Sequence, residues 1–219
     1  MPDADTPATK PTIEFWFDFG SNYSYISTMR IEAAASRSGL QVRWRPFLLG
    51  PIFRSFGWES SPFVLQAAKG EYVWKDMVRE CRKAGIAWRK PSVFPRPAVL
   101  PLRVALVGAG QTWIGAYCRR MMALNFAEDR DIDSVETVAE VLHGLGLEAG
   151  EILAAAQSDA NKRRLREQTE AAKALRIFGA PTFLVGDEMF WGNDRLDDAI
   201  AEALRVGGPP IVGRRPQTP

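Results

Sequence analysis

The order of strand-like and helix-like segments constrains the fold of this chain more than any other feature. Short apolar runs bounded by turn residues, which predict strands, occur only near the two ends, within 13–47 and 181–191. The windows between these stretches follow the helical period over about 130 residues. One sheet, whose two halves are separated by a helical insertion, accounts for this order.

The first half has the pattern of a strand, a helix and a second strand. A buried strand is predicted over Ile13–Phe19 (IEFWFDF), a helix over Tyr23–Ser38 and another strand over Leu40–Phe47. Ser21 or Asn22 is the expected N-cap of the helix, because either side chain can accept a hydrogen bond from a free backbone N–H. Strands joined through a helix pair in parallel with a right-handed crossover.

The second half has the pattern of a hairpin and a closing helix. Strands are predicted over Pro181–Val185 and Glu188–Trp191, joined by Gly186-Asp187, and a helix over Leu196–Val206. Between the halves, a Pro-rich connector is expected over 90–101, with helices over Tyr72–Ala84, Pro101–Ala109, Trp113–Asn125, Val135–Leu145, Glu151–Ala156 and Asn161–Phe178.

A strand-helix-strand unit followed by a hairpin and a helix is the thioredoxin arrangement. We therefore predict an α/β, thioredoxin-like fold with a large all-helical insertion. The expected divisions are a disordered leader (1–12), a thioredoxin-like domain (13–47 plus 179–206), a helical insertion subdomain (48–178) and a loose tail (207–219).

Composition excludes several classes of protein. The 28 Lys and Arg nearly balance the 26 Asp and Glu, and a net charge of +2 argues against a broad basic face for nucleic acid. No apolar run approaches the roughly 18 residues of a membrane span. The first eleven residues are polar and Pro-rich, without the apolar core of a signal peptide. We expect a cytoplasmic protein that binds neither nucleic acid nor membrane.

The few cysteines and the single histidine narrow the chemistry further. Cys81 and Cys118 match no zinc-binding spacing, and we expect no metal site. His143 lies at the end of an apolar-periodic helix. A helix C-terminus stabilises an imidazolium, so a capping role is expected for His143. The chemistry of this protein is therefore expected to proceed without a histidine.

A turn with two serines is the first candidate site. In a thioredoxin-like fold the reactive group lies where the first strand turns into the first helix, and that turn reads Ser21-Asn22-Tyr23-Ser24. Serine occupies both cysteine positions of a CxxC motif, so dithiol exchange is chemically excluded there. What remains is a hydroxyl at a helix N-terminus, a place that favours an anion. The alternative is that both serines only cap the helix.

Two later motifs support a ligand at this turn. Ala180-Pro181 opens the hairpin, and in thioredoxin-like folds this bond is cis and the residue before proline presents its backbone to a bound peptide. Asn193-Asp194 precedes the last helix, where either residue is a candidate N-cap and the carboxylate suits an ammonium group. The positive charge of Arg195 is unfavourable in the first turn of this expected helix, because the N-terminal end of the helix dipole is also positive. A capping role for Asn193-Asp194 alone therefore does not explain Arg195. Together these motifs predict a glutathione site.

Five segments in a fixed order carry a family resemblance. They are FDFGSNYSY (17–25), RPFLLGPIFR (45–54), AKGEYVW (68–74), PSVFPR (91–96) and FGAPTFLVGDEMFWGNDRL (178–196). The chain resembles the 2-hydroxychromene-2-carboxylate isomerases, within the kappa-class glutathione transferase branch of the DsbA-like thioredoxin fold. The resemblance implies a homodimeric, glutathione-dependent enzyme that interconverts 2-hydroxychromene-2-carboxylate and trans-o-hydroxybenzylidenepyruvate, an aromatic carboxylate.

The resemblance also implies roles for individual residues. Ser21 falls on the catalytic serine, which stabilises the glutathione thiolate. The expected glutathione contacts are Ser21, Lys69, Ala180, Trp191, Gly192, Asn193 and Asp194, and the expected substrate contacts are Arg54 and Phe94. The chain departs from many relatives at Asn22, Glu59 and Pro97, and Glu59 adds a negative charge near the expected carboxylate site.

Other functions stay open at this point. A general kappa-like glutathione transferase would use the same Ser21 and differ only in the walls of its pocket. A non-catalytic thioredoxin-like binding module would keep the fold without the chemistry. A thiol-disulfide oxidoreductase is excluded at this turn because neither serine can form a disulfide.

Overall fold

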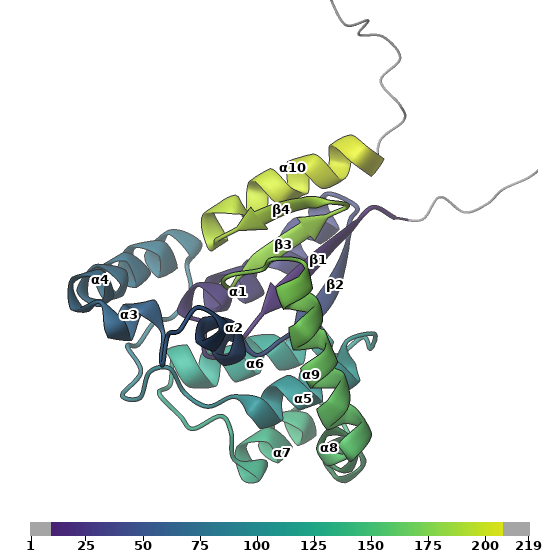
Figure 1. Ribbon diagram of the computed structural model, residues 1–219. Helices are drawn as coiled ribbons and strands as arrows, with labels where there is room; N and C mark the ends of the chain where they lie inside the picture. Colours follow the sequence, from purple (N-terminus) through teal and green to yellow (C-terminus); the bar gives the residue numbers. More distant parts are fainter. Residues whose placement is uncertain (1–9, 208–219) are drawn as a thin grey trace, which may run out of the picture.

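A four-stranded sheet forms the centre of the computed structural model, which describes residues 10–207 (Figure 1). Its strands are β1 (Thr12–Phe17), β2 (Gln41–Pro46), β3 (Thr182–Val185) and β4 (Glu188–Trp191), in the order β2-β1-β3-β4. Residues 1–9 and 208–219, on which most of the predicted leader and tail fall, lie outside the described residues.

Pairing of β1 with β3 joins the two ends of the chain, as predicted. β1 runs parallel to β2 and antiparallel to β3, and Phe15 lies opposite Phe183. β3 and β4 form the predicted antiparallel hairpin around the Gly186-Asp187 turn, and Gly186 has a φ of 57°. This strand order confirms the predicted thioredoxin-like α/β fold. The division of the chain into separate domains stays a prediction.

Ten helices surround this sheet within residues 10–207. They are α1 (Asn22–Arg37), α2 (Leu49–Ser55), α3 (Pro62–Leu65), α4 (Ala67–Ala84), α5 (Val99–Gly108), α6 (Ile114–Phe126), α7 (Val135–Gly144), α8 (Ala149–Gln157), α9 (Asp159–Ala174) and α10 (Leu196–Gly207). In the view of Figure 1, α10 lies above the sheet and α5 to α8 lie below it. The short helices α2 and α3 were not predicted, and α4 begins five residues earlier than the predicted Tyr72. No helix among the described residues is long and apolar enough to cross a membrane.

The predicted continuation of α9 to Phe178 is wrong, because the helix ends at Ala174. Arg176 adopts a left-handed φ of 58°, its N–H bonds to the carbonyl of Lys173, and the N–H of Ile177 bonds to the carbonyl of Ala172. This is the hydrogen-bond pattern of a Schellman motif. Glycine is the usual residue at the left-handed position, and an arginine there carries no stop signal in the sequence.

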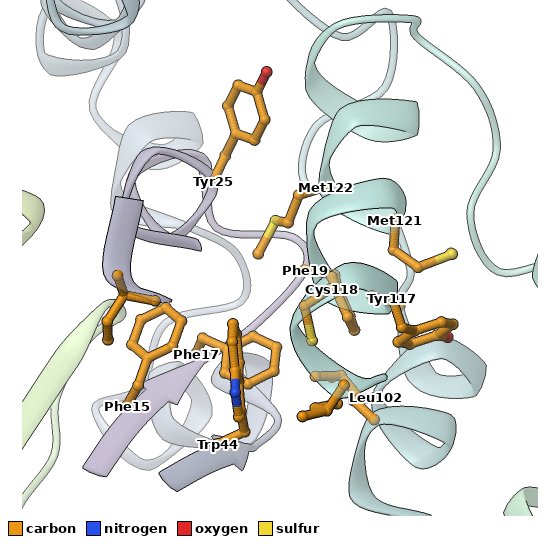
Figure 2. Close-up of a cluster of buried hydrophobic side chains, with 14 of the residues drawn as sticks. Phe15, Phe17, Phe19, Tyr25, Trp44, Leu102, Tyr117, Cys118, Met121 and Met122 are labelled. Carbon is orange, nitrogen blue, oxygen red and sulfur yellow. The ribbon is translucent and has the colours of Figure 1, made fainter. Parts of the chain in front are cut away.

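Aromatic residues of the sheet form the main core with helices of the insertion. Phe15 stacks on Phe17 and on Phe183, with ring centroids 5.1 and 5.4 Å apart, and Trp44 packs edge-on against Phe15. Figure 2 shows these rings of β1 and β2 facing Leu102 of α5 and a row of side chains on α6. The core thus binds the insertion to the sheet.

A smaller apolar cluster covers the other face of the sheet. Trp16 and Leu184 point to this face, because successive side chains of a strand alternate, and they pack with Ala172 and Ile177. The end of α9 therefore lies across the sheet immediately before the chain enters β3. The sharp helix stop positions the next residues, 178–181, beside the start of α1.

A buried polar network holds the insertion against the turn between β1 and α1. The side-chain N–H of Asn125 donates to the carbonyl of Phe19 at 3.0 Å, and its oxygen accepts from Arg96 at 3.0 Å. Arg96 is buried and also donates to Asp129, which accepts from the backbone N–H of Ser92 at 2.8 Å. The Ser92 N–H, followed by the Arg96 guanidinium, lowers the pKa of Asp129 to about 2.

Replacing Asp129 tests this network through its pH dependence. A carboxylate with a lowered pKa contributes stability above its unfolded pKa of about 3.9 and loses it as the pH falls towards the folded value. We expect Asp129→Asn to lower the free energy of unfolding at neutral pH. Asparagine tolerates the left-handed φ of 57° at this position. The difference from wild type should shrink between about pH 4 and about pH 2, measured by urea unfolding.

Asp187→Asn, in the exposed turn between β3 and β4, controls for the loss of one surface carboxylate. A difference between wild type and Asp129→Asn that keeps its size throughout the acid range would mean that the Asp129 charge does not support the network.

Candidate active site

Ser21 lies where β1 ends and α1 begins, and it is the N-cap of α1, as predicted. Its Oγ accepts a hydrogen bond from the backbone N–H of Ser24 at 3.2 Å and donates one to the carbonyl of Ala180 at 2.9 Å. Only 6% of the residue is exposed. The Ala180–Pro181 bond is cis, as predicted, and the unpredicted Phe94–Pro95 bond is cis as well. The structure thus brings together residues separated by 159 positions.

Asp18 fixes the shape of this turn from inside. Its carboxylate accepts hydrogen bonds from the backbone N–H groups of Gly20 at 2.7 Å and Leu49 at 2.8 Å. Burial raises the pKa of Asp18, and the two N–H donors oppose that rise. The carboxylate joins the turn to the first residue of α2. This role was not predicted, although an acidic residue directly after an aromatic strand is the signal that could have revealed it.

Several backbone groups at this turn are free to bind a ligand. The N–H groups of Asn22 and Tyr23 lie in the first turn of α1 and have no acceptor within residues 10–207, and the same holds for the N–H of Ala180. Helix N-terminal N–H groups favour an anion, and a free N–H beside a carbonyl can extend a ladder with a peptide. The carbonyl of Ala180 completes that pair.

Asn193 links the hairpin end of the site to α1. The predicted capping of the last helix by Asn193 or Asp194 is wrong, because both lie in a 3-10 turn, Asn193–Arg195, that precedes α10. The side-chain oxygen of Asn193 accepts from Ser27 at 3.1 Å and from Arg30 at 3.2 Å. This oxygen therefore holds the turn in place. The two donors were not predicted, because α1 and this turn are far apart in the chain.

The carboxylate of Asp194 is the exposed acidic group at this end of the site. Its side chain is 71% exposed and lies 3.4 Å from Arg195, which also pairs with Asp198 at 2.9 Å. Arg195 thus lies in the 3-10 turn before α10, where these two carboxylates neutralise its charge. Gly192 adopts a φ of 111°, and a Cβ there would lie 2.5 Å from the Asp194 oxygen. Glycine at 192 thus lets the Asp194 side chain adopt this position.

Trp191 forms an exposed wall of the site on the edge strand β4. It is 52% exposed and packs on Phe178 with ring centroids 4.9 Å apart. A Cβ on Gly179 would lie 2.4 Å from the indole nitrogen, so only glycine allows the indole to lie over the chain beside Ala180. Gly179 was not predicted, although its place directly before Ala180 in the segment FGAP was the available signal.

Aromatic side chains of α4 and of the 91–96 segment gather on the other side of the turn. Phe94 packs edge-on against Trp74 with ring centroids 4.7 Å apart. Tyr23, two residues after Ser21 in the first turn of α1, packs against Phe63 and donates its hydroxyl proton to Asp76 at 2.8 Å. Burial and then Asp76 raise the pKa of Tyr23, so its proton stays on the phenol.

The predicted cations Arg54 and Lys69 lie on the surface, and neither side chain is hydrogen-bonded to a predicted site residue within residues 10–207. Arg54 is at the end of α2 and Lys69 is near the start of α4, where its ammonium lies 5.9 Å from the Phe63 ring. Neither makes an ion pair within the described residues. Glu59 and Pro97, two departures from the family pattern, are exposed. The third, Asn22, is buried, and its side-chain nitrogen has no hydrogen-bond partner among residues 10–207.

Neither cysteine of the protein is an activated thiol. Cys81 and Cys118 are both buried and unpaired. Burial raises the pKa of Cys81 to about 12 and that of Cys118 well above its ordinary value. Among residues 10–207, no group of three or more His, Cys, Asp and Glu side chains could hold a metal ion. His143 lies exposed in the last turn of α7.

The arrangement around Ser21 fits a thiol-bearing peptide. The hydroxyl and the free N–H groups of α1 suit a thiolate, and the N–H and carbonyl of Ala180 suit a peptide backbone. The carboxylate of Asp194 suits an ammonium group. Glutathione carries all three of these groups, so the residues present fit it.

Comparison with known proteins places the chain in a family. A model of the DSBA-like thioredoxin domain matches residues 12–205. A 2-hydroxychromene-2-carboxylate isomerase of Pseudomonas putida is 30% identical over 188 residues, which cover 84% of this chain and 90% of that protein. Glutathione S-transferase kappa 1 of Caenorhabditis elegans is 24% identical over 213 residues, which cover 91% of this chain and 93% of that protein.

A solved structure agrees with these relatives. The structure of a 2-hydroxychromene-2-carboxylate isomerase superposes with a TM-score of 0.80 at 27% identity, covering 89% of this chain and 97% of that one. The chain therefore belongs to the DSBA-like thioredoxin domain family and, within it, to the 2-hydroxychromene-2-carboxylate isomerase family of enzymes.

Proposed function

We propose that this enzyme uses glutathione to interconvert 2-hydroxychromene-2-carboxylate and trans-o-hydroxybenzylidenepyruvate. The observation that carries the proposal is the pairing of the buried Ser21 hydroxyl with Ala180 at the N-terminus of α1. When bound, glutathione supplies a thiolate that can add reversibly to a conjugated double bond and so allow rotation about it. The residues of the protein have to hold the peptide, keep the sulfur ionised and orient the substrate.

Ser21 and the start of α1 are sufficient to ionise a thiol without a histidine. A thiol with a pKa of about 8.5 needs about 2.7 kcal/mol of preferential stabilisation to lower that value by about two units. One hydrogen bond to a charged acceptor contributes about 1.5–3 kcal/mol, and a helix N-terminus adds about 0.3–1 kcal/mol. The thiols of Cys81 and Cys118 do not supply the thiolate in this proposal, because burial raises the pKa of both.

The residues around the turn divide the proposed site into two parts. Ala180, Trp191 and Gly192, with Asn193 and Asp194, are proposed to hold glutathione, and Lys69 is proposed to lie near its glycine carboxylate. Phe94, packed on Trp74, offers an aromatic surface to the substrate. Arg54, which has no ion pair within the described residues, is proposed to bind the substrate carboxylate. The expected homodimer and the cytoplasmic location stay predictions.

A general glutathione transferase of the kappa kind is the second candidate. The kappa relative supports it, because the same Ser21 would ionise glutathione for attack on other electrophiles. An ultraviolet assay with the chromene acid separates the two functions: isomerisation that requires glutathione supports the first proposal, and conjugation without isomerisation supports the second. A protein that is not retained on a glutathione resin would favour the non-catalytic binding module.

Removing the carboxylate of Asp194 tests the proposed ammonium contact. Asp194→Ala should weaken glutathione binding by about 1.5–3 kcal/mol, which is about 10- to 150-fold in Kd, because a charge-assisted hydrogen bond is lost. Calorimetric titration measures this change. Asp187→Ala removes the same charge at the opposite end of β4 and should leave Kd unchanged. Equal affinity of wild type and Asp194→Ala would show that Asp194 does not contact the ligand.

Replacing Ser21 tests its role towards the thiolate. Ser21→Ala should lower isomerase turnover at neutral pH by about 10- to 150-fold, because a hydrogen bond of about 1.5–3 kcal/mol is lost. The deficit should shrink as the pH rises past the ordinary thiol pKa of about 8.5, since the solvent then ionises the thiol without help. The measurement is turnover against pH at saturating glutathione.

Ser158→Ala is the matched control for this variant. Ser158 is the N-cap of α9 and, like Ser21, accepts from a backbone N–H at 3.2 Å and donates to a carbonyl, here at 2.8 Å. Its replacement removes a helix cap without touching the site, and turnover should not change. A Ser21→Ala deficit that is constant across pH would contradict thiolate stabilisation and favour another role for the hydroxyl.

A further inference from the structure

The single proton of the Ser21 hydroxyl already has an acceptor in this structure. Oγ donates to the carbonyl of Ala180 at 2.9 Å and accepts from the N–H of Ser24 at 3.2 Å. A hydroxyl has one donor, so no proton is left for a second acceptor while this bond persists. While the Ser21 hydroxyl donates to Ala180, it therefore cannot stabilise a thiolate.

The proposed function needs that same proton at the sulfur. Turning the hydroxyl away from Ala180 removes the only hydrogen bond that its carbonyl accepts within residues 10–207. Ala180 is half-buried, and a carbonyl left without a donor in such a place costs free energy. Activation of the thiol is thus opposed unless another donor reaches the Ala180 carbonyl.

An N-acylated cysteine brings such a donor with the sulfur. In glutathione the amide N–H and the CH2–S group are attached to the same carbon atom. Within the described part of the chain, the N–H of Ala180 has no acceptor, and its carbonyl accepts from Ser21 alone. Ala180 therefore presents a donor and an acceptor side by side to a peptide. A peptide backbone can satisfy both, as in strand addition.

We propose that the Ala180 carbonyl holds the Ser21 proton until the amide N–H of an N-acylated cysteine replaces it, so that this N–H selects which thiols the enzyme activates. The inference rests on the proposed function. The Ser21 proton stays on Oγ and only changes its acceptor, from the Ala180 carbonyl to the thiolate. The proton of the thiol goes to water. Binding of the correct backbone and ionisation of the sulfur are thereby coupled.

An ester analogue of glutathione tests the coupling. In this analogue an ester oxygen replaces the cysteinyl amide N–H, and the thiol and both ends of the molecule are kept. The thiolate absorbance in the ultraviolet, titrated against pH at saturating thiol, gives the pKa of each bound thiol relative to that thiol in solution. We expect wild type to lower the pKa of glutathione more than that of the ester, by about one unit, or about tenfold in acidity.

Ser21→Ala supplies the second half of the comparison. Without the hydroxyl, there is no Ser21 proton for the amide N–H to displace from the Ala180 carbonyl. Both bound thiols should therefore show the same small lowering of the pKa. Ser158→Ala, the control described above, should behave like wild type. If Ser21→Ala does not fold, the comparison of the two thiols on wild type is still decisive, because equal shifts there overturn the inference.

The possible failures are distinguishable. If glutathione gives no saturable thiolate signal with wild type, the proposed function is wrong and this inference falls with it. If both thiols bind and ionise equally, glutathione use stands and only the coupling is wrong. A gap between the thiols that is equally large in wild type and Ser21→Ala would show that the N–H acts without Ser21, and this also overturns the inference.

Discussion

The antiparallel pairing of β1 with β3 is the interaction on which the rest of this structure depends. It sets Phe15 against Phe183 in the stacked core and, at the ends of the same two strands, Ser21 against Ala180. The site is therefore a product of strand register. A slip of one residue would turn Phe183 out of the core and would move the Ala180 carbonyl away from the hydroxyl at the same time.

Two further interactions hold the site from its sides. Asp18 fixes the turn to α2, and Asn125 fixes the same turn to the insertion. Both act on backbone groups within three residues of Ser21. The helical insertion thus contributes to the position of the hydroxyl as well as to the walls around it. The proposed mechanism, which uses no histidine, needs such rigid placement, because in it a single hydroxyl and a helix terminus stabilise the thiolate.

The sequence was sufficient for the sheet, most of the helices and the position of Ser21, because these depend on local periodicity and turn residues. It was insufficient where the outcome depends on distant contacts. The end of α9 at a left-handed Arg176 has no local signal, since glycine usually occupies such a position. Asparagine commonly caps helices, yet the side-chain oxygen of Asn193 accepts hydrogen bonds from donors on α1. From the sequence, Asp18 could be a surface charge beside an aromatic run. Only the fold reveals the two backbone N–H groups that donate hydrogen bonds to its carboxylate.

The distance along the chain between β1 and β3 has a consequence for synthesis on the ribosome. Glu14 pairs with Leu184, so the ribosome must translate the whole insertion before this pair can form. At about 5–20 residues per second this takes roughly 10–30 s. Throughout that interval β1, with its run of large aromatic side chains, has β2 on one side and an open edge on the other. An open apolar edge recruits other strands, so the nascent chain is vulnerable to aggregation until β3 arrives.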